Sequence, residues 1–160
     1  MGSLEEPPLP KYERSYGFVA WPPDGMKGVP RQFAFTEHPN PLEDVGLDFE
    51  AQQDTGYPVS LQFTRHVVLN STVSGMRLFK AKKRGAKYEN GEEIPCWLHT
   101  PDEPLYKRLV MRDVVFVIPK EVLESNETYK AVVSMTYRGV PREVEWTFTT
   151  GSRMQGLGKL

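Results

Sequence analysis

Metal binding is the first chemistry that the side chains of this sequence suggest. His38, His66, His99 and the single cysteine, Cys96, carry the imidazole and thiol groups that bind a soft metal such as copper. Metal sites usually show short ligand spacings such as H-x-H, H-x₃-H or C-x₂-C, and none of these occurs in the sequence. We therefore interpret the histidines as isolated side chains and Cys96 as a buried structural thiol, and we assign no metal ligand.

A cluster of positive charge is the second candidate. Five cations fall within eight residues, namely Lys80, Lys82, Lys83, Arg84 and Lys87. They suit a docking patch for an anionic partner such as a wall polymer (teichoic acid), an anionic lipid or an acidic protein segment. The alternative, which we favour, is a solvated strand edge whose charges oppose aggregation. Nucleic acid is not an expected partner, because the net charge is −1 and Tyr88 alone cannot form a platform for bases.

The three tryptophans offer a possible surface for stacking sugars. Trp146 shares the core-facing pattern of its strand, whereas Trp21 and Trp97 have no such pattern and are candidates for exposure. Packing in the core or in loops is the preferred interpretation, because aromatic side chains are mostly used in that way.

Signatures of catalysis are missing from the sequence. It contains no G-x-S-x-G nucleophile motif and no glycine-rich phosphate loop, and Cys96 has no histidine nearby except His99. We therefore expect no catalytic residue, no cofactor and no enzymatic activity.

The composition favours one domain rich in turns. The chain has 160 residues, of which 14 are Pro and 13 are Gly, and 39% are apolar. A single cysteine excludes a disulfide within the chain. No apolar run approaches the ~20 residues that a membrane-spanning helix needs. The first residues lack the plan of a signal peptide and are interpreted as an expression remnant, so this lack carries no information on cellular location.

The domain boundaries follow from changes in composition. Residues 1–14 are interpreted as the expression remnant and a Pro-rich linker, and residues 151–160 as a C-terminal tail. Between them, residues 15–150 form the expected domain, interrupted by an acidic loop insertion at 37–57. Six acidic residues and no Lys or Arg occupy 37–54, so we expect this loop to be mobile, or docked without a regular strand.

Period-two alternation of apolar and polar residues predicts about seven short strands, with at most one helical turn, at 120–125. The predicted strands cover residues 32–35, 59–64, 75–83, 93–99, 114–118, 128–137 and 143–149. The run at 114–118 is continuously apolar, which is typical of a strand covered on both faces. Asn90-Gly91 is expected to form a hairpin turn, and Pro95 indicates an edge strand. The fold class is therefore all-β, an immunoglobulin-like β-sandwich with a long acidic loop, and a closed barrel is its structural competitor.

The last third of the chain resembles a bacterial Ig-like domain. The stretch VVFVIPKEVLESNETYKAVVSMTYRGVPREVEWTFTT has a strand ending at Pro119, then Leu123, then a strand opened by Thr128-Tyr129. The resemblance implies that Leu123 fills one end of the sandwich. It also implies that Tyr129 buries its ring and returns its hydroxyl to the backbone, as in the tyrosine corner of such folds.

A second resemblance concerns the first half of the chain. The segments YGFVAWPPDGMKGVPRQFAFTEHPNP and GYPVSLQF resemble the Ig-like segment that accompanies some bacterial proteins of the cysteine-rich secretory protein (CAP) superfamily. This resemblance implies an accessory segment beside a separate CAP domain. The catalytic-looking His/Glu constellation of that superfamily belongs to the CAP domain, so no site residue is transferred to this chain.

These observations predict a non-catalytic accessory or interaction module of a bacterial secreted or cell-surface protein. Its expected partners are a neighbouring domain of the same protein and, through the cation cluster, an anionic wall polymer or a protein. The alternative is a periplasmic β-sandwich that binds a small ligand or copper. An extracellular or periplasmic location is expected from the resemblance alone.

Overall fold

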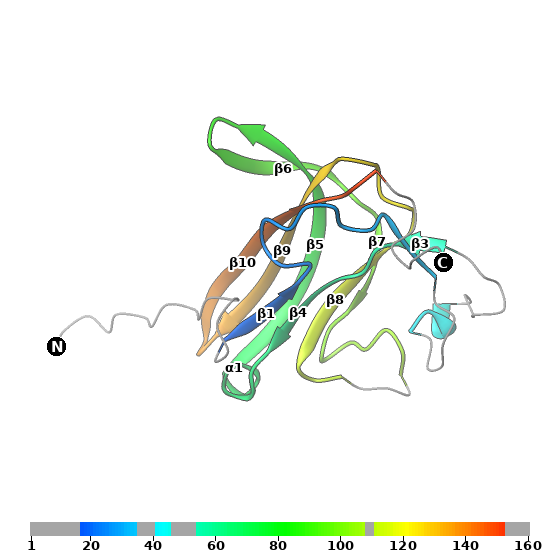
Figure 1. The fold of residues 1–160 in the computed structure, drawn as a ribbon. Helices are drawn as coiled ribbons and strands as arrows, with labels where there is room; N and C mark the ends of the chain where they lie inside the picture. Colours follow the sequence, from blue (N-terminus) through cyan, green and yellow to red (C-terminus); the bar gives the residue numbers. More distant parts are fainter. Residues whose placement is uncertain (1–16, 35–40, 46–53, 108–110, 153–160) are drawn as a thin grey trace.

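The protein is an all-β sandwich in which two four-stranded sheets face each other (Figure 1). The computed structural model describes residues 17–34, 41–45, 54–107 and 111–152. All strand pairings within the sheets are antiparallel. The two main sheets enclose one apolar core, and a two-stranded sheet made of β2 (Gln32–Ala34) and β3 (Asp54–Gly56) lies beside them.

The first sheet has the strand order β1-β4-β8-β7. Its strands are β1 (Phe18–Trp21), β4 (Val59–Phe63), β8 (Val114–Pro119) and β7 (Cys96–His99). In β4 the alternation predicted from the sequence is confirmed, because Val59, Leu61 and Phe63 are buried in the core.

The second sheet has the order β10-β9-β5-β6. Its strands are β10 (Val140–Thr149), β9 (Thr128–Tyr137), β5 (Ser71–Arg84) and β6 (Lys87–Glu93). The predicted alternation in β9 and β10 is also confirmed. The alternating side chains that turn to the interior are all buried, and they are Tyr129, Ala131, Val133, Met135, Tyr137, Val144, Trp146 and Phe148.

A second apolar cluster covers the outer face of the first sheet. Val115 and Val117 of β8 point into the main core, whereas Phe116 and Ile118 point to the opposite face. There they pack with Leu42, which precedes the short 3₁₀ helix η1 (Glu43–Val45), and with side chains of the segment between β7 and β8. The continuous apolar run of β8 is therefore explained by burial on both faces, as predicted.

The corner near Leu123 and Tyr129 has the expected geometry. Both side chains are buried in the main core. The hydroxyl oxygen of Tyr129 accepts a hydrogen bond of 2.8 Å from the backbone N–H of Glu124, five residues upstream. We call this end of the sandwich the corner end, and the opposite end, which carries the six-residue helix α1 (Arg65–Asn70), the α1 end.

The position predicted for the hairpin turn, Asn90-Gly91, is wrong. The β5–β6 turn lies at residues 85–86, where Gly85 has a positive φ of 60°. Gly91 lies instead within β6, beside a shift in the register of pairing with β5. A Cβ atom at Gly91 would lie 2.5 Å from the carbonyl oxygen of Lys80. The glycine therefore permits a close approach of two strands, which is the other common use of glycine in a strand.

Three further expectations need correction. The single strand expected at 93–99 is divided between two strands, because the chain leaves the second sheet after Glu93 and joins the first sheet at Cys96. Pro95 lies between β6 and β7. As predicted, β7 is an edge strand. The loop expected at 37–57 contains η1 and ends in β3, whereas its parts at 37–40 and 46–53 lie outside the described residues. At 120–125, where at most one helical turn was expected, no helix forms, but the helix α1 lies where no helix was expected.

The corner leads to a ranked set of changes in stability. Leu123→Ala should lower the free energy of unfolding by about 2–5 kcal/mol, because it empties a buried leucine site. Tyr129→Phe should cost about 0.5–1.5 kcal/mol, because it removes one hydrogen bond and keeps the ring. The exposed Lys82→Ala should change stability by no more than about 0.5 kcal/mol. Urea denaturation of the three variants measures the order, and a Leu123→Ala protein as stable as Lys82→Ala would contradict the corner.

Candidate functional site

His99 is fully buried and both of its ring nitrogens are occupied. Nδ1 accepts a hydrogen bond of 3.1 Å from the backbone N–H of Leu105, and Nε2 lies 3.1 Å from the carbonyl oxygen of Met111. A carbonyl can only accept, so these two contacts require the neutral tautomer with its proton on Nε2. The ring stacks on Phe116 with centroids 4.6 Å apart. His99 thus anchors the segment between β7 and β8 and has no nitrogen left for a metal.

Among the described residues, the other side chains considered as metal ligands are not grouped with His99. His66 is exposed on α1, where its Nε2 lies 2.9 Å from the hydroxyl of Tyr137. His38 lies outside the described residues. Within the part of the chain that the structure describes, no three His, Cys, Asp or Glu side chains are grouped so as to hold a metal ion.

Cys96 has the environment of a structural thiol. Its Sγ donates to the carbonyl oxygen of Ile94 at 3.3 Å, and the side chain packs against the main core. Burial, assisted by the negative charge of Glu93 and opposed by Lys120, raises the pKa of the Cys96 thiol to about 12. The thiol is therefore protonated near neutral pH, which disfavours both metal binding and nucleophilic attack.

The three tryptophans do not form a common surface. Trp146 is buried, and its indole N–H donates to the carbonyl of Pro22 at 2.9 Å, which confirms the prediction of a core residue. Trp21 is 48% exposed and donates to the hydroxyl of Tyr57. Trp97 is partly buried, with the ammonium of Lys120 5.6 Å from its ring centroid. Trp21 and Trp97 lie on the two opposite edge strands of the first sheet, three strand spacings or about 14 Å apart, too far for one stacking platform.

The cation cluster divides into two parts with different roles. Lys80 lies at the corner end, where its Nζ is 2.7 Å from Glu124 and 3.5 Å from Glu92. The hydrogen bond to Glu124 is the main reason why the pKa of Lys80 is raised. Lys80 therefore has a structural role at the base of the hairpin. The other four cations, Lys82, Lys83, Arg84 and Lys87, lie on the exposed hairpin formed by the end of β5 and the start of β6.

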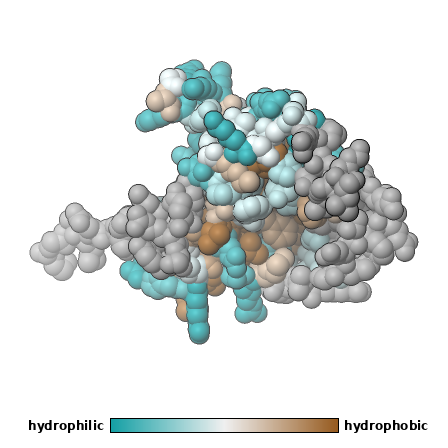
Figure 2. Space-filling view, viewed as in Figure 1, coloured by the Kyte–Doolittle hydropathy of each residue, from teal (hydrophilic) through white to brown (hydrophobic). Residues whose placement is uncertain are grey.

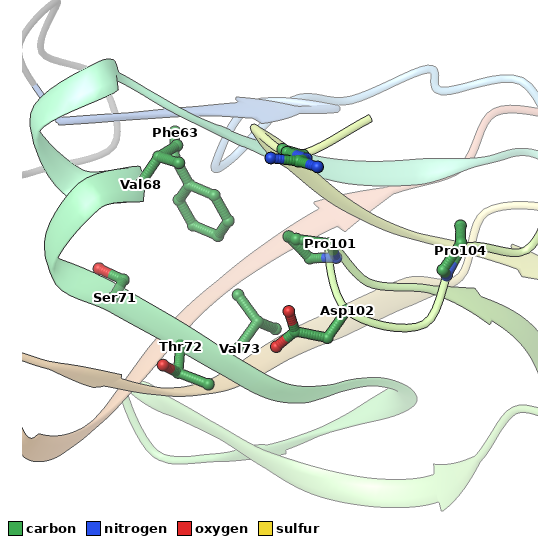
Figure 3. A pocket seen from close by; sticks show the side chains of 9 residues that line it. Phe63, Val68, Ser71, Thr72, Val73, Pro101, Asp102 and Pro104 are labelled. Carbon is green, nitrogen blue, oxygen red and sulfur yellow. The ribbon is translucent and has the colours of Figure 1, made fainter. Parts of the chain in front are cut away.

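A pocket of about 490 Å³ opens at the α1 end, between the two sheets (Figure 3). Phe63 and Val73 line it from opposite sheets, and Pro101 and Pro104 close one side. Asp102 and Arg112 also line it, and neither of them forms an ion pair with any residue that the structure describes. The volume suits a small molecule, since ligand pockets commonly measure about 300–1,000 Å³.

Asp102 and Arg112 were not singled out from the sequence. They are ten residues apart in the segment between β7 and β8, whose composition resembles an ordinary loop. Only the packing of this segment on the outer face of the first sheet, through His99 and the second apolar cluster, places both side chains at the open end of the sandwich.

Comparison of the sequence with models of protein families gives no match, and comparison with curated proteins gives none either. Within the described residues, no helix has the length and the apolar character needed to cross a membrane.

The two hydrogen bonds of His99 predict a pH dependence of stability. Burial lowers the pKa of His99 below the ordinary value of 6.5, and protonation of Nδ1 would place a second N–H against that of Leu105. The unfolded chain therefore binds this proton first, so stability is complete above about pH 6.5 and falls as the pH is lowered through that value. The loss should be at most about 1.4 kcal/mol per pH unit.

The variant His99→Gln retains one acceptor and one donor but does not titrate. Urea denaturation of both proteins between pH 7.5 and 5 should therefore show a smaller loss of stability on acidification in the variant. An identical pH dependence of the two proteins would contradict a neutral, buried His99.

Proposed function

We propose that this domain is a non-catalytic, Ig-like accessory or interaction module of a bacterial secreted or cell-surface protein. The observation that carries the proposal is the position of the two ends of the sandwich. At the α1 end, Gly17 lies beside the start of the helix, where its carbonyl accepts from the backbone N–H of Thr64. At the corner end, Gly151 follows β10 and its carbonyl accepts from Asn126.

The described chain thus enters the sandwich at one end and leaves it at the other. β10 alone has ten residues, which at about 3.4 Å per residue separates the two ends by roughly 30 Å. This arrangement suits a module placed in series, which holds a neighbouring domain at a distance. The resemblance to the Ig-like segment of CAP-superfamily proteins supports the same arrangement, and it is also the source of the proposed extracellular or periplasmic location.

One edge of the second sheet is covered by another part of the chain, which suits a spacer. Residues 25–29 run along the open side of β10, where Gly25 and Val29 donate to the carbonyls of Thr147 and Thr149. This segment covers one edge of the second sheet, which lowers the tendency of the module to pair with other strands.

A second candidate function is the binding of a small ligand by a periplasmic sandwich, and the pocket at the α1 end supports it. Copper is less well supported, because both nitrogens of His99 are engaged and the Cys96 thiol is held protonated. Calorimetric titration with copper tests the copper-binding form of this second function: tight, stoichiometric binding would favour the periplasmic carrier over the accessory module.

The proposal predicts where the protein is found and at what size. An antibody raised against this chain, used on fractionated cells of the source organism, should detect a species markedly larger than 160 residues in the secreted or surface fraction. A cytosolic species no larger than this chain would contradict the proposal. A cytosolic marker protein controls for lysis during fractionation.

A further inference from the structure

The β5–β6 hairpin projects beyond the rest of the second sheet (Figure 1). The pairing of β5 with β9 ends at Lys80 and Tyr129, whereas the pairing of β5 with β6 continues to Arg84 and Lys87. Residues 81–90 therefore form a two-stranded ribbon, which we call the arm. Its base is braced by Lys130, whose Nζ donates to the carbonyl of Tyr88 at 3.1 Å. In the space-filling view the arm is a mostly hydrophilic projection (Figure 2).

The arm is strongly positive in a chain whose net charge is −1. It contains four cations and one carboxylate, Glu89, which gives a net charge of +3. Arg84 pairs with Glu89 at 3.2 Å. Lys82, Lys83 and Lys87 are exposed and form no ion pair with any residue that the structure describes.

Several basic residues elsewhere in the same sheet form ion pairs with acidic residues. Arg77 pairs with Glu93, Lys80 pairs with Glu124, and Lys130 lies 3.0 Å from Glu145. Near the core, Arg77, Lys80 and Lys130 therefore each have an acidic partner. The unmatched lysines of this sheet are confined to the arm.

The arm also carries an arrangement that opposes its own folding. Arg84 and Lys87 are directly opposite each other beside the turn, and like charges at such positions are destabilising. A two-stranded ribbon is marginally stable in water even without such repulsion. Charges that only protected a strand edge from pairing would not have to face each other at the tip. These charges are therefore better explained by a partner than by the fold.

The geometry of the arm favours a flexible polymer. Successive side chains of a strand point to opposite faces, so Lys82, Arg84 and Lys87 share one face and Lys83 lies on the other. A bilayer or a folded protein would contact one face, whereas a flexible chain can follow both. The tip, Gly85-Ala86, has no large apolar side chain to insert into a membrane. Lysines act as mobile point charges, which suits phosphate groups without fixed geometry.

We propose that the arm binds a flexible polyanion that carries phosphate groups along its length. This proposal names a partner class for the interaction module and so rests on the function proposed above. It also removes Lys80 from the docking patch predicted from the sequence, because Lys80 stabilises the base of the arm and does not contact the ligand.

Binding of fluorescently labelled inorganic polyphosphate, measured by anisotropy, tests the proposal. The wild-type chain should bind saturably, and its affinity should fall about 20-fold between 50 and 200 mM salt, as expected when about three phosphates of a flexible polyanion are neutralised. The triple variant Lys82→Ala, Lys83→Ala, Lys87→Ala should bind at least about tenfold more weakly. Its stability in urea should not fall, because the repulsion between Arg84 and Lys87 is removed.

A matched control removes the same amount of charge elsewhere. Lys27→Ala, Arg65→Ala and Lys107→Ala together change three exposed cations outside the arm, and this variant should bind within about twofold of the wild type. Absence of wild-type binding, or an equal loss in both triple variants, would overturn the proposal. Tighter binding to duplex DNA or to phosphatidylserine vesicles than to polyphosphate would also overturn it. The fractionation experiment does not involve the arm. A protein that is found at the surface but fails to bind polyphosphate would therefore refute polyanion binding by the arm and leave the accessory-module function standing.

Discussion

The pairing of β9 with β5 is the constraint on which the rest of this structure depends. β9 lies between β10 and β5 and is paired with both along most of its length. Its register fixes the buried alternation that forms one wall of the core, and it places Tyr129 where its hydroxyl reaches the backbone of Glu124. Because β9 begins at Thr128 while β5 continues to Arg84, the same register also decides that the end of β5 leaves the sandwich as an arm.

The two ends of the sandwich differ in character. The corner end is closed by Leu123 and Tyr129 and carries the arm, so its exposed features are charges. The α1 end is open between the sheets, and the segment between β7 and β8 borders its pocket. That segment depends on the neutral His99 to satisfy two backbone groups at the outer face of the first sheet. An interaction module with a polyanion-binding arm and a pocket for a small molecule would therefore use opposite ends of the domain.

Much of the fold could be predicted from local patterns, and the errors have physical reasons. Alternation identified β4, β9 and β10 because each has one face in the core, and the continuous apolar run of β8 correctly indicated burial on both faces. Asn90-Gly91 misled because a glycine between strands serves equally well in a turn and at a close approach, and only the position of Lys80 on the neighbouring strand decides between them. The change of sheet at Pro95 was missed because the preceding strand, β6, is rich in Glu, Asn and Gly, which are depleted in strands, so the pattern indicated only one strand there.

The candidate sites were less predictable than the fold. Five neighbouring cations look equivalent in the sequence, but Glu124 and Glu92 pair with one of them from other parts of the chain. The burial of His99 and the meeting of Asp102 and Arg112 at one pocket also depend on contacts between distant segments. Contacts between distant segments produce no short spacing in the sequence from which they could be predicted.

Amide hydrogen exchange monitored residue by residue along β5 tests most directly whether its register with β9 separates a stable sheet from a projecting arm. Amides paired with β9 between Thr72 and Lys80 should exchange slowly, close to the limit of global unfolding. Amides of residues 82–89 in the arm should exchange faster by orders of magnitude. Uniform protection along the whole of β5 and β6 would contradict a projecting arm, because it would show that the arm is packed against the domain.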